Sequence, residues 1–517
     1  MSITPTAIAS APDWSQPVEV AGSGAGSSVG IDGRGTITAA WFTQEPQAFV
    51  ATREAGSESF QPPLNLGGAG AVAPELAVNE AGAAVVAWIE RATRCEGLSF
   101  LDCPHRLGIR VRARAGTEFG PARYVAEDAT ETPAVAINQA GEAVVAWPGQ
   151  GGTIAAVLGS ARDGFAAPMQ LRPATGQGFS PRRVAAIGED GTALVSWMSF
   201  GGPVMASYRP SGGAFGAPEE VSPVDPSNGL AAVVNAHGTA TVAFMSNADA
   251  ALVLSTRDPG RRFRPGRSLG ASAVSEVALD QDAGDNQLVY WTEQTGPREN
   301  GPPRPTHQSH ASFRDAGEDW GDPLSILPPN SFPTLNLDRM GNAHALWTTN
   351  QSHGGRIMGA TLTRFGILER PQLLTEFSGQ VSDMEANRAG AAVGIFTEVL
   401  DSSTATVQTA VRVVSRLADE RAARVRMAAS VSTTAVRIRA RCDEPCRLRA
   451  RLGGQRKAAA ARGPAVLTLR ARRRGSLRIA LARRTRARLL GGRRVTLVVR
   501  AADGAGNMRT IRRRLSL

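Results

Sequence analysis

Lysine, tyrosine and cysteine are scarce in this chain of 517 residues. It contains one lysine, Lys457, three tyrosines and four cysteines, and only 5% of its residues are aromatic. No apolar run approaches the roughly 18 residues that cross a bilayer, which excludes a membrane-spanning helix. Glycine and proline together make up 88 residues, a content typical of many turns and short strands. The length exceeds that of one ordinary domain, so repeats must be sought first.

Charge is divided unevenly along the chain. Residues 411–517 contain 30 of the 57 basic residues and only five acids, whereas residues 1–410 contain 27 bases and 41 acids. Because arginine replaces lysine almost everywhere, the choice of arginine says little, but its clustering is informative. Such asymmetry indicates a polyanionic partner or an attraction between domains.

Eight copies of one pattern occupy the first 410 residues. Each has an apolar strand, an Asp or Asn, two residues, a Gly, and a second apolar strand with an aromatic residue six positions after the Gly. The Gly-to-Gly spacings are 47, 59, 50, 47, 46, 57 and 49 residues, close to the length of a four-stranded propeller blade. The copies are Asp32–Gly35–Trp41, Asn79–Gly82–Trp88, Asn138–Gly141–Trp147, Gly188–Gly191–Trp197, Asn235–Gly238–Phe244, Asp280–Gly284–Trp291 with one inserted residue, Asp338–Gly341–Trp347 and Asn387–Gly390–Phe396.

A second marker, an aromatic residue followed by Pro and then an aliphatic residue, precedes each copy, as in Phe60–Pro63–Leu66. Proline lacks an amide donor and favours an edge strand, so this marker predicts the outermost strand of each blade. The first marker, Trp14–Val20, precedes the first copy and would complete the last blade. We therefore predict an all-β fold with an eight-bladed β-propeller over residues 12–415, closed by its N-terminal strand. The recurrent aromatic residues are expected to pack between blades.

Residues 416–517 are predicted to form a small basic β-sandwich. Arginine alternates with apolar residues there, which predicts strands with one buried face and one arginine face that carries Arg437, Arg439, Arg447 and Arg449. The turn at 503–507 before the last strand resembles bacterial immunoglobulin-like modules of secreted and surface proteins. The arginine face is either solvated, a polyanion-binding surface, or a surface that docks on the acidic propeller. Nucleic acid is disfavoured, because no aromatic residue follows Phe396.

The four cysteines form two local pairs, Cys95/Cys103 and Cys442/Cys446, which predict disulfides and an oxidising compartment. Zinc bound by Cys95, Cys103 and His105 is the alternative, but that spacing matches no standard site. Residues 1–11 end in Ala9–Ser10–Ala11, typical of the end of a signal peptide. We expect a leader upstream of this start and an extracellular or cell-surface location. No metal or cofactor is expected.

The repeats resemble secreted bacterial β-propellers of the sialidase-like and related superfamilies. They depart from the sialidase Asp-box, and no Tyr/Glu nucleophile pair or arginine triad is evident, so no catalytic residue follows from the resemblance. Two long insertions, 90–108 and 293–311, are predicted to face each other across the ring. Loops on rigid scaffolds often bind ligands. The candidate rim residues are His105, His307, His310 and His353, with His307 and His310 in a Pro-rich, solvated loop.

Two functions fit these patterns. The favoured one is an extracellular binding or adhesion protein, whose propeller loops bind a ligand such as a glycan and whose basic domain contacts an anionic cell-surface polymer. The alternative is a carbohydrate-active enzyme, a glycoside hydrolase or lyase, that uses the propeller funnel. Carboxyl groups from several blades that converge in the funnel would favour the enzyme. The oligomeric state stays open.

Overall fold

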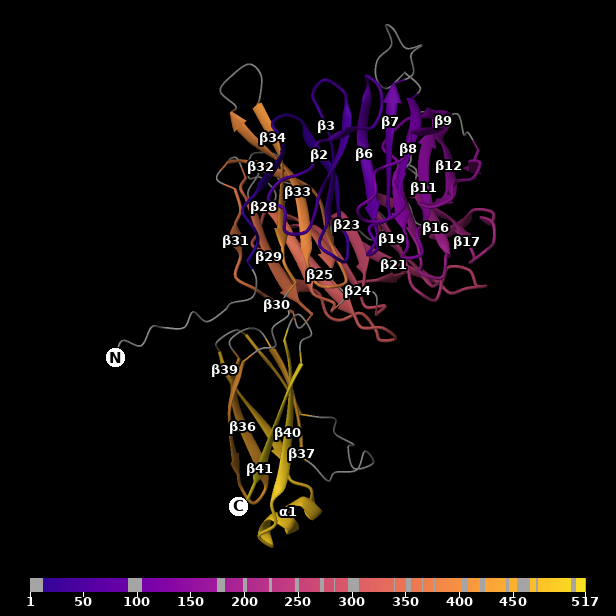
Figure 1. Ribbon diagram of the computed structural model, residues 1–517. Helices are drawn as coiled ribbons and strands as arrows, with labels where there is room; N and C mark the ends of the chain where they lie inside the picture. The colour runs from indigo at the N-terminus through magenta and orange to yellow at the C-terminus, as the bar shows by residue number, and fades with distance from the viewer. Residues whose placement is uncertain are drawn as a thin grey trace, which may run out of the picture. The chain divides into compact units, whose positions relative to one another are not determined.

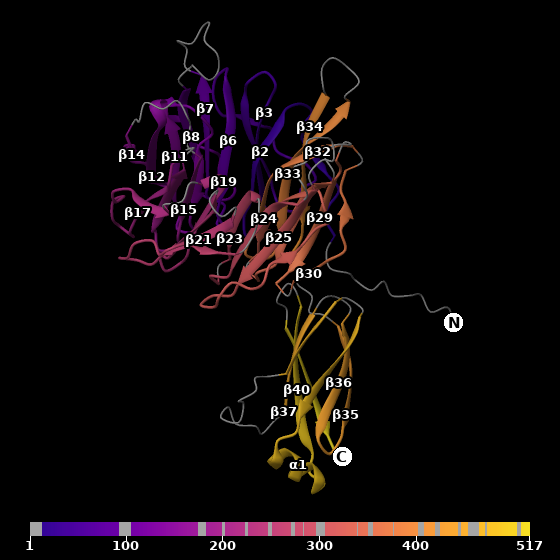
Figure 2. The same ribbon diagram turned by 180° about the vertical axis from the view of Figure 1, so that it is seen from behind.

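The computed structural model contains two units of β-strands (Figure 1; Figure 2, from behind). We call Trp14–Ala360 with Pro371–Arg416 the N-terminal unit, and Leu417–Leu517, which belongs to the other unit, the C-terminal unit. The structure describes residues 13–91, 105–173, 182–198, 202–222, 226–246, 251–269, 274–282, 284–295, 306–338, 340–349, 355–364, 366–375, 377–401, 408–418, 424–442, 446–452, 465–470, 473–503 and 508–516. No helix within these ranges is both long and apolar enough to span a membrane.

The N-terminal unit is built from antiparallel sheets in which strands follow one another in chain order. The inner strands are β2 (Ala25–Ile31), β6 (Ala71–Val78), β10 (Ala134–Ile137), β15 (Arg182–Ile187), β19 (Pro226–Val234), β23 (Val274–Gln281), β27 (Ser331–Leu337) and β32 (Gly379–Ala386). The central strands are β3 (Ile37–Phe42), β7 (Ala84–Arg91), β11 (Glu142–Gly149), β16 (Ala193–Met198), β20 (Ala240–Ser246), β24 (Gln287–Thr295), β28 (Ala343–Thr349) and β33 (Ala392–Asp401).

Third and outer strands complete the sheets. The third strands are β4 (Ala48–Arg53), β8 (His105–Arg112), β12 (Thr153–Ser160), β17 (Val204–Arg209), β21 (Ala251–Arg257), β25 (Thr306–Arg314), β29 (Ile357–Thr363) and β34 (Gln408–Arg416). The outer strands are β1 (Val18–Ala21), β5 (Leu64–Asn65), β9 (Arg123–Ala129), β13 (Gly164–Phe165), β14 (Met169–Arg172), β18 (Glu219–Ser222), β22 (Arg267–Ser268), β26 (Leu324–Ser325), β30 (Ile367–Leu368) and β31 (Gln372–Leu373). The proline-bearing segments do supply outer strands. Strands β6–β14 share one sheet, because the single pair Gly149–Ala129 joins β11 to β9.

The Asp/Asn-x-x-Gly segments form the turns between inner and central strands. In the second repeat the side-chain oxygen of Asn79 accepts hydrogen bonds from the backbone N–H groups of Ala81 (3.1 Å) and Ala83 (2.9 Å). Its amide nitrogen donates to the carbonyl oxygen of Asn138 in the next repeat, at 2.9 Å. Gly82 has a φ of +75°, where glycine carries no steric penalty. Asn therefore fixes its own turn and ties it to the neighbouring one.

The alignment of the sixth repeat was wrong. Asp282, rather than Asp280, is the turn residue, because its side chain accepts hydrogen bonds from the N–H groups of Gly284 (2.8 Å) and Asn286 (2.9 Å). The position with positive φ is Asp285, at +62°, and Trp291 follows it by six residues without an insertion. Aspartate tolerates the left-handed region better than most residues, so it replaces the glycine of the other repeats.

The recurrent aromatic residues are core residues, as predicted. Trp88 is fully buried, in one apolar cluster with Ala40 and Val50 of the preceding repeat. Trp147 likewise packs on Val85 of the repeat before it. The remaining members of the set, each at most 2% exposed, are Trp41, Trp197, Phe244, Trp291, Trp347 and Phe396. Sheets therefore adhere to one another through one large aromatic side chain per repeat.

The N-terminal strand β1 lies in the same sheet as the last repeat. It pairs antiparallel with β34, with Val18 opposite Val413, and Trp14 forms a further bridge with Arg416. Inner strand β2 contacts both β6 and β32, and the other inner strands contact their neighbours in chain order. Radially arranged four-stranded sheets that pack through their inner strands are the architecture of a β-propeller.

Substitution of Gly141 by Ala tests the turn. Gly141 has a φ of +84°, and a Cβ built there meets only the Cβ of Ala161, at 4.0 Å. Space is therefore available, and the cost of the left-handed backbone remains, about 1–2 kcal/mol in the free energy of unfolding. Urea denaturation checks this value. Gly216→Ala, where φ is not positive, is the control, and an equal effect of both substitutions would contradict the explanation.

The C-terminal unit consists of two sheets that share one core. One sheet contains β35 (Val425–Val431), β36 (Ala435–Cys442) and β39 (Arg474–Ala480); the other contains β38 (Ala465–Leu469), β37 (Cys446–Leu452), β40 (Val495–Asp503) and β41 (Met508–Leu515). Alternate residues of both sheets are buried in a common cluster that includes Ile438, Leu448 and Leu497. The predicted disulfide between Cys442 and Cys446 is confirmed and connects the two sheets.

Helix α1 (Arg483–Leu490) was not predicted. It lies between β39 and β40, and two of its side chains, Thr485 and Leu489, are buried. Arginine, alanine and leucine all favour helix, and the helix ends where Gly491 and Gly492 follow, the latter with a φ of +72°. Arginine repeated every second residue resembles a strand, so the local pattern misleads here.

Candidate functional site

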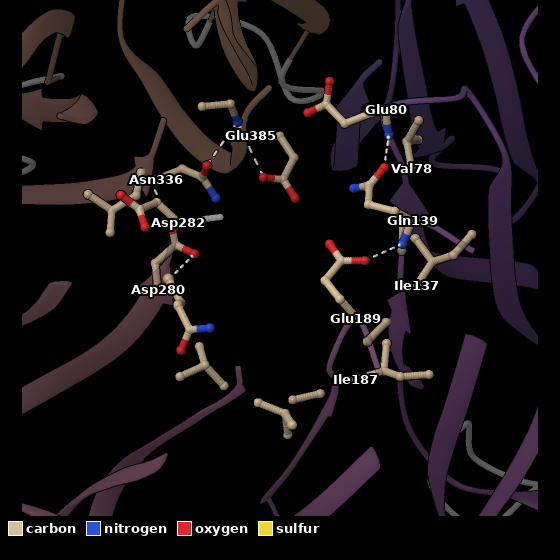
Figure 3. A pocket seen from close by; sticks show the side chains of 18 of the residues that line it. Val78, Glu80, Ile137, Gln139, Ile187, Glu189, Asp280, Asp282, Asn336 and Glu385 are labelled. Carbon is tan, nitrogen blue, oxygen red and sulfur yellow. Dashed lines mark hydrogen bonds between the residues drawn. The ribbon is translucent and has the colours of Figure 1, made fainter. Parts of the chain in front are cut away.

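A cavity of about 420 Å³ runs between the inner strands of the N-terminal unit (Figure 3). Its aliphatic walls include Val78, Ile137 and Ile187, one from each of three successive repeats. It reaches the turns between inner and central strands, at the opposite end of the inner strands from the rim that the sequence analysis favoured. We call this cavity the channel. No aromatic side chain is among its lining residues, so it lacks the flat stacking surface typical of sugar sites.

One wall of the channel is polar. Asp280, Asn336 and Glu385 occupy the same position, two residues before the turn, in three successive repeats, and Figure 3 shows them on the side opposite Ile137 and Ile187. The other repeats have glycine, alanine or valine at this position. A departure from the repeat consensus was thus visible in the sequence, but the misaligned sixth repeat concealed Asp280.

These polar side chains hold neighbouring inner strands together. Asp280 accepts a hydrogen bond from the N–H of Leu337, at 2.5 Å, and Asn336 accepts one from the N–H of Ala386, at 2.9 Å. Asp383 accepts hydrogen bonds from the N–H of Val29, at 2.9 Å, and from the hydroxyl of Ser28, at 3.0 Å. Each of these three side chains is joined by a hydrogen bond to a backbone N–H group of the next repeat. The side chain thus supplies an acceptor for an N–H group at the inner edge of a sheet.

Burial raises the pKa values of the carboxyl groups in the inner strands. The pKa of Glu75 rises to about 8, first through desolvation and then through repulsion by Asp383. Desolvation raises the pKa values of Asp280 and Asp383 to about 6 each, although backbone hydrogen bonds oppose it. The pKa of Glu385 rises well above its usual value through burial and the nearby Asp280 and Asp383. Carboxyl groups of three repeats therefore influence one another among the inner strands, and two of them, Asp280 and Glu385, line the channel itself.

The turn end of the channel carries further acids. Glu189 accepts a hydrogen bond from the N–H of Gln139, at 3.0 Å, and Gln139 accepts one from the N–H of Glu80, also at 3.0 Å. Arg388, from the last repeat, forms an ion pair with Glu189 of the fourth. One guanidinium group thus already lies among these carboxylates. The carboxylates at this end of the channel can attract cations or accept hydrogen bonds from hydroxyl groups.

Three of the four predicted rim histidines lie on strands. His105 begins β8 and is buried, 1% exposed, and burial lowers its pKa. His307 and His310 lie on β25 rather than in a solvated loop: His307 packs against Phe332, and the imidazole of His310 stacks on Trp291 and lies 3.2 Å from Glu293. His353 and the pair Cys95/Cys103 lie outside the described residues, as do residues 92–104 and 296–305 of the two insertions.

A Tyr/Glu pair that the sequence analysis missed lies in the second repeat. The hydroxyl of Tyr124 donates to Glu90 at 2.6 Å, and Arg106 forms an ion pair with the same carboxylate at 2.7 Å. Glu90 is 3% exposed. Desolvation of Tyr124, followed by its hydrogen bond to Glu90, raises the pKa of Tyr124 to about 12. The contact joins the outer strand β9, which contains Tyr124, to the central strand β7, which contains Glu90.

The predicted arginine face is divided between two sheets. Arg437 and Arg439 project from β36 on the outer face of one sheet, and both are exposed. Arg447 and Arg449 project from β37 on the outer face of the other sheet, where Arg449 is exposed and Arg447 half-buried. Buried apolar residues alternate with all four arginines.

Within the described ranges, no group of three or more His, Cys, Asp or Glu side chains is arranged to hold a metal ion. No family model matches the chain, and no curated protein matches it. Several solved structures are similar in fold. The lectin BP39L from Burkholderia pseudomallei is 14% identical to this chain, with a TM-score of 0.48. The matched region covers 69% of this chain and 100% of the lectin chain.

Two further structures are similar at lower scores. A polysaccharide lyase of family 25, an ulvan lyase, is 10% identical, covers 78% of this chain and 94% of its own, and has a TM-score of 0.42. The β-propeller domain of the trilobed protease from Pyrococcus furiosus is 10% identical, with a TM-score of 0.40. The match covers 71% of this chain and 99% of that domain's chain. The fold and the site define a β-propeller protein with an acid-lined channel and an arginine-rich C-terminal β unit.

Proposed function

We propose that the chain is an extracellular or cell-surface binding protein that attaches to an anionic cell-surface polymer through its C-terminal unit. In this proposal residues 12–415 form an eight-bladed propeller closed by β1, and residues 416–517 form an immunoglobulin-like sandwich. The pairing of β1 with β34 and the shared core of the two C-terminal sheets support this division. The disulfide Cys442–Cys446 supports an oxidising compartment.

One observation carries the attachment function: both outer faces of the C-terminal unit expose arginines. The strands β35, β36 and β39 contain no acid, and Asp503 is the one acid among the described residues of this unit. Arginine presents five N–H donors in a planar fork that matches oxyanions bidentately. The propeller would then hold its channel, or the loops of its rim, at the surface to which the C-terminal unit binds.

Binding of the full chain to immobilised anionic cell-wall polymers, across a salt series, tests the proposal. We expect binding that weakens steeply as salt rises, because each arginine contact releases counterions. Replacement of Arg437, Arg439, Arg447 and Arg449 by Gln should weaken binding at least about 10-fold. The control removes the same charge from exposed arginines of the N-terminal unit, through Gln at Arg114, Arg162, Arg261 and Arg262. Absence of binding at low salt, or equal loss in both variants, contradicts the proposal.

A carbohydrate-active enzyme is the second candidate. It is favoured by the raised pKa values of Asp280 and Glu385, which line the channel, since a carboxyl group with a raised pKa can act as a general acid. Release of reducing ends or of unsaturated sugars from a polysaccharide panel would support it. The activity would have to fall in Asp280→Asn, whose side chain still accepts the hydrogen bond from Leu337.

A further inference from the structure

One outer face of the C-terminal unit concentrates six arginines on three adjacent strands. The sheet β35–β36–β39 exposes Arg426, Arg437, Arg439, Arg441, Arg474 and Arg478. The register sets Arg426 and Arg474 directly opposite Arg441, one on each side, so that three guanidinium groups form one row across the sheet. Arg437 and Arg478 form a second pair in the same way.

Like charges directly opposite each other on neighbouring strands destabilise a sheet. None of the six arginines is in an ion pair with any residue that the structure describes, and these three strands carry no acid. The sheet thus bears an uncompensated repulsion along Arg426–Arg441–Arg474. A solvated face needs only scattered charge, whereas a row of this kind is relieved when an anion binds between its members.

The same face is hollowed. A groove of about 680 Å³ is lined by Arg426, Arg439, Arg441, Arg474 and Ser476, together with Ala428. The groove follows from the register, since Arg439 lies between Ala428 and Ser476, whose small side chains leave room on both sides. Four guanidinium groups and one hydroxyl therefore line a single depression.

We infer that this groove binds sulfate or phosphate ester groups of a carbohydrate-type polymer, an assignment that rests on the proposed attachment function and specifies its ligand. A sulfate or phosphate monoester presents three acceptor oxygens, which suits the convergence of Arg426, Arg441 and Arg474 better than the two oxygens of a carboxylate do. Along β36, Arg437, Arg439 and Arg441 recur about every 7 Å, two residues apart. A polymer with anionic groups at similar intervals would engage several rows at once.

The opposite sheet and the lack of aromatic residues in the C-terminal unit indicate which face binds the polymer and which class of polymer it is. The opposite sheet has one direct arginine pair in its described register, Arg449 with Arg500, and its next row places Arg451 beside Val498. Nucleic acid is the weaker occupant, because the unit has no aromatic side chain on which a base could stack. The site is therefore assigned to the β35–β36–β39 face and to a ligand without bases.

The experiment measures affinity of the full chain for four probes of matched charge density at 0.1 M salt: a sulfated polysaccharide, a polysaccharide that carries phosphate monoesters, a polycarboxylate and single-stranded DNA. Arg426→Gln/Arg441→Gln/Arg474→Gln removes three charges from the groove. Arg449→Gln/Arg500→Gln/Arg512→Gln removes three from the opposite sheet. We expect the first variant to bind the sulfate or phosphate polymer at least about 30-fold more weakly, with a lower salt slope, and the second to lose less than about 5-fold.

The unfolding temperature of the groove variant distinguishes a binding site from a face whose arginines stabilise the fold. Because neutralisation relieves like-charge repulsion, the groove variant should unfold at the same temperature as the wild type or a higher one. Arg441→Lys keeps the charge but loses the bidentate fork, so it should retain the salt slope at reduced affinity. Equal losses in the two triple variants, or tighter binding of the polycarboxylate or the DNA, would overturn the assignment and leave the attachment function standing. Failure of the wild-type chain to bind all four probes would remove both.

Discussion

Replacement of Trp88 by alanine is expected to lower the free energy of unfolding of the N-terminal unit by about 3–5 kcal/mol, the usual cost of removing a fully buried large aromatic side chain. Trp88 is 0% exposed and packs at the junction of the first two repeats. Its indole nitrogen donates to Glu90 at 3.4 Å, and its ring makes an edge contact with Tyr124. The substitution therefore leaves a cavity and also removes one donor from a buried carboxylate.

Urea denaturation followed by tryptophan fluorescence and circular dichroism measures this loss. Phe377→Ala, at a residue that is 52% exposed, is the matched control and should change stability by less than about 0.5 kcal/mol. Gly108→Ala is an independent test of the packing around Trp88 and should also destabilise the protein, because a Cβ at position 108 would lie 2.4 Å from the Trp88 ring. A loss below about 1 kcal/mol in Trp88→Ala would show that neighbouring sheets adhere by other means.

Stability should fall as pH rises through the neutral range because of the buried carboxyl groups of the inner strands. A carboxyl group whose pKa is raised in the folded protein binds its proton more tightly there than in the unfolded chain. For Glu75 the two pKa values are 4.5 and about 8, so its favourable contribution is complete below pH 4.5 and is lost by about pH 8. Asp280 and Asp383 contribute with the same sign between 3.8 and about 6.

Glu75→Gln isolates this effect. At pH 8.5 the variant should be more stable than the wild type by on the order of 3 kcal/mol, since a shift of one pKa unit corresponds to about 1.4 kcal/mol. At pH 4 the two proteins should be equally stable. Thermal unfolding at both pH values measures the difference, and the exposed Glu58→Gln is the control. A variant that is equally or less stable at pH 8.5 would mean that Arg183 compensates the Glu75 carboxylate.

The repeat pattern predicted most of the N-terminal unit because its signals recur. An aromatic residue six positions after a turn glycine has the same burial in every copy, so one correct assignment extends to all. The outer strands were found for the same reason, since in each repeat a proline lies just before an outer strand. The sixth turn was misread because Asp285 occupies a position that elsewhere belongs to glycine, and the two differ in residue type but share the left-handed backbone.

The buried carboxyl groups of the inner strands could not be predicted as a group from one sequence. Glu75 and Asp383 are 308 residues apart, and their proximity to each other and to Asp280 depends on which inner strands lie next to one another. The strand positions of His307 and His310 were missed because proline-rich flanks resemble a loop. The four predicted arginines were correctly placed on outward faces, but the strand order that divides them between two sheets is set by tertiary packing.

The pairing of β1 with β34 also bears on how the chain is synthesised. Val18 is made almost four hundred residues before its partner Val413, and contacts of such sequence separation form slowly because the intervening loop must close first. During translation β1 has no partner while the middle repeats can already pair locally. The last sheet is completed only after residue 416 has left the ribosome. Ribosome-bound chains arrested before that point would expose β1 and β33 as unpaired edges, the species most prone to misassembly.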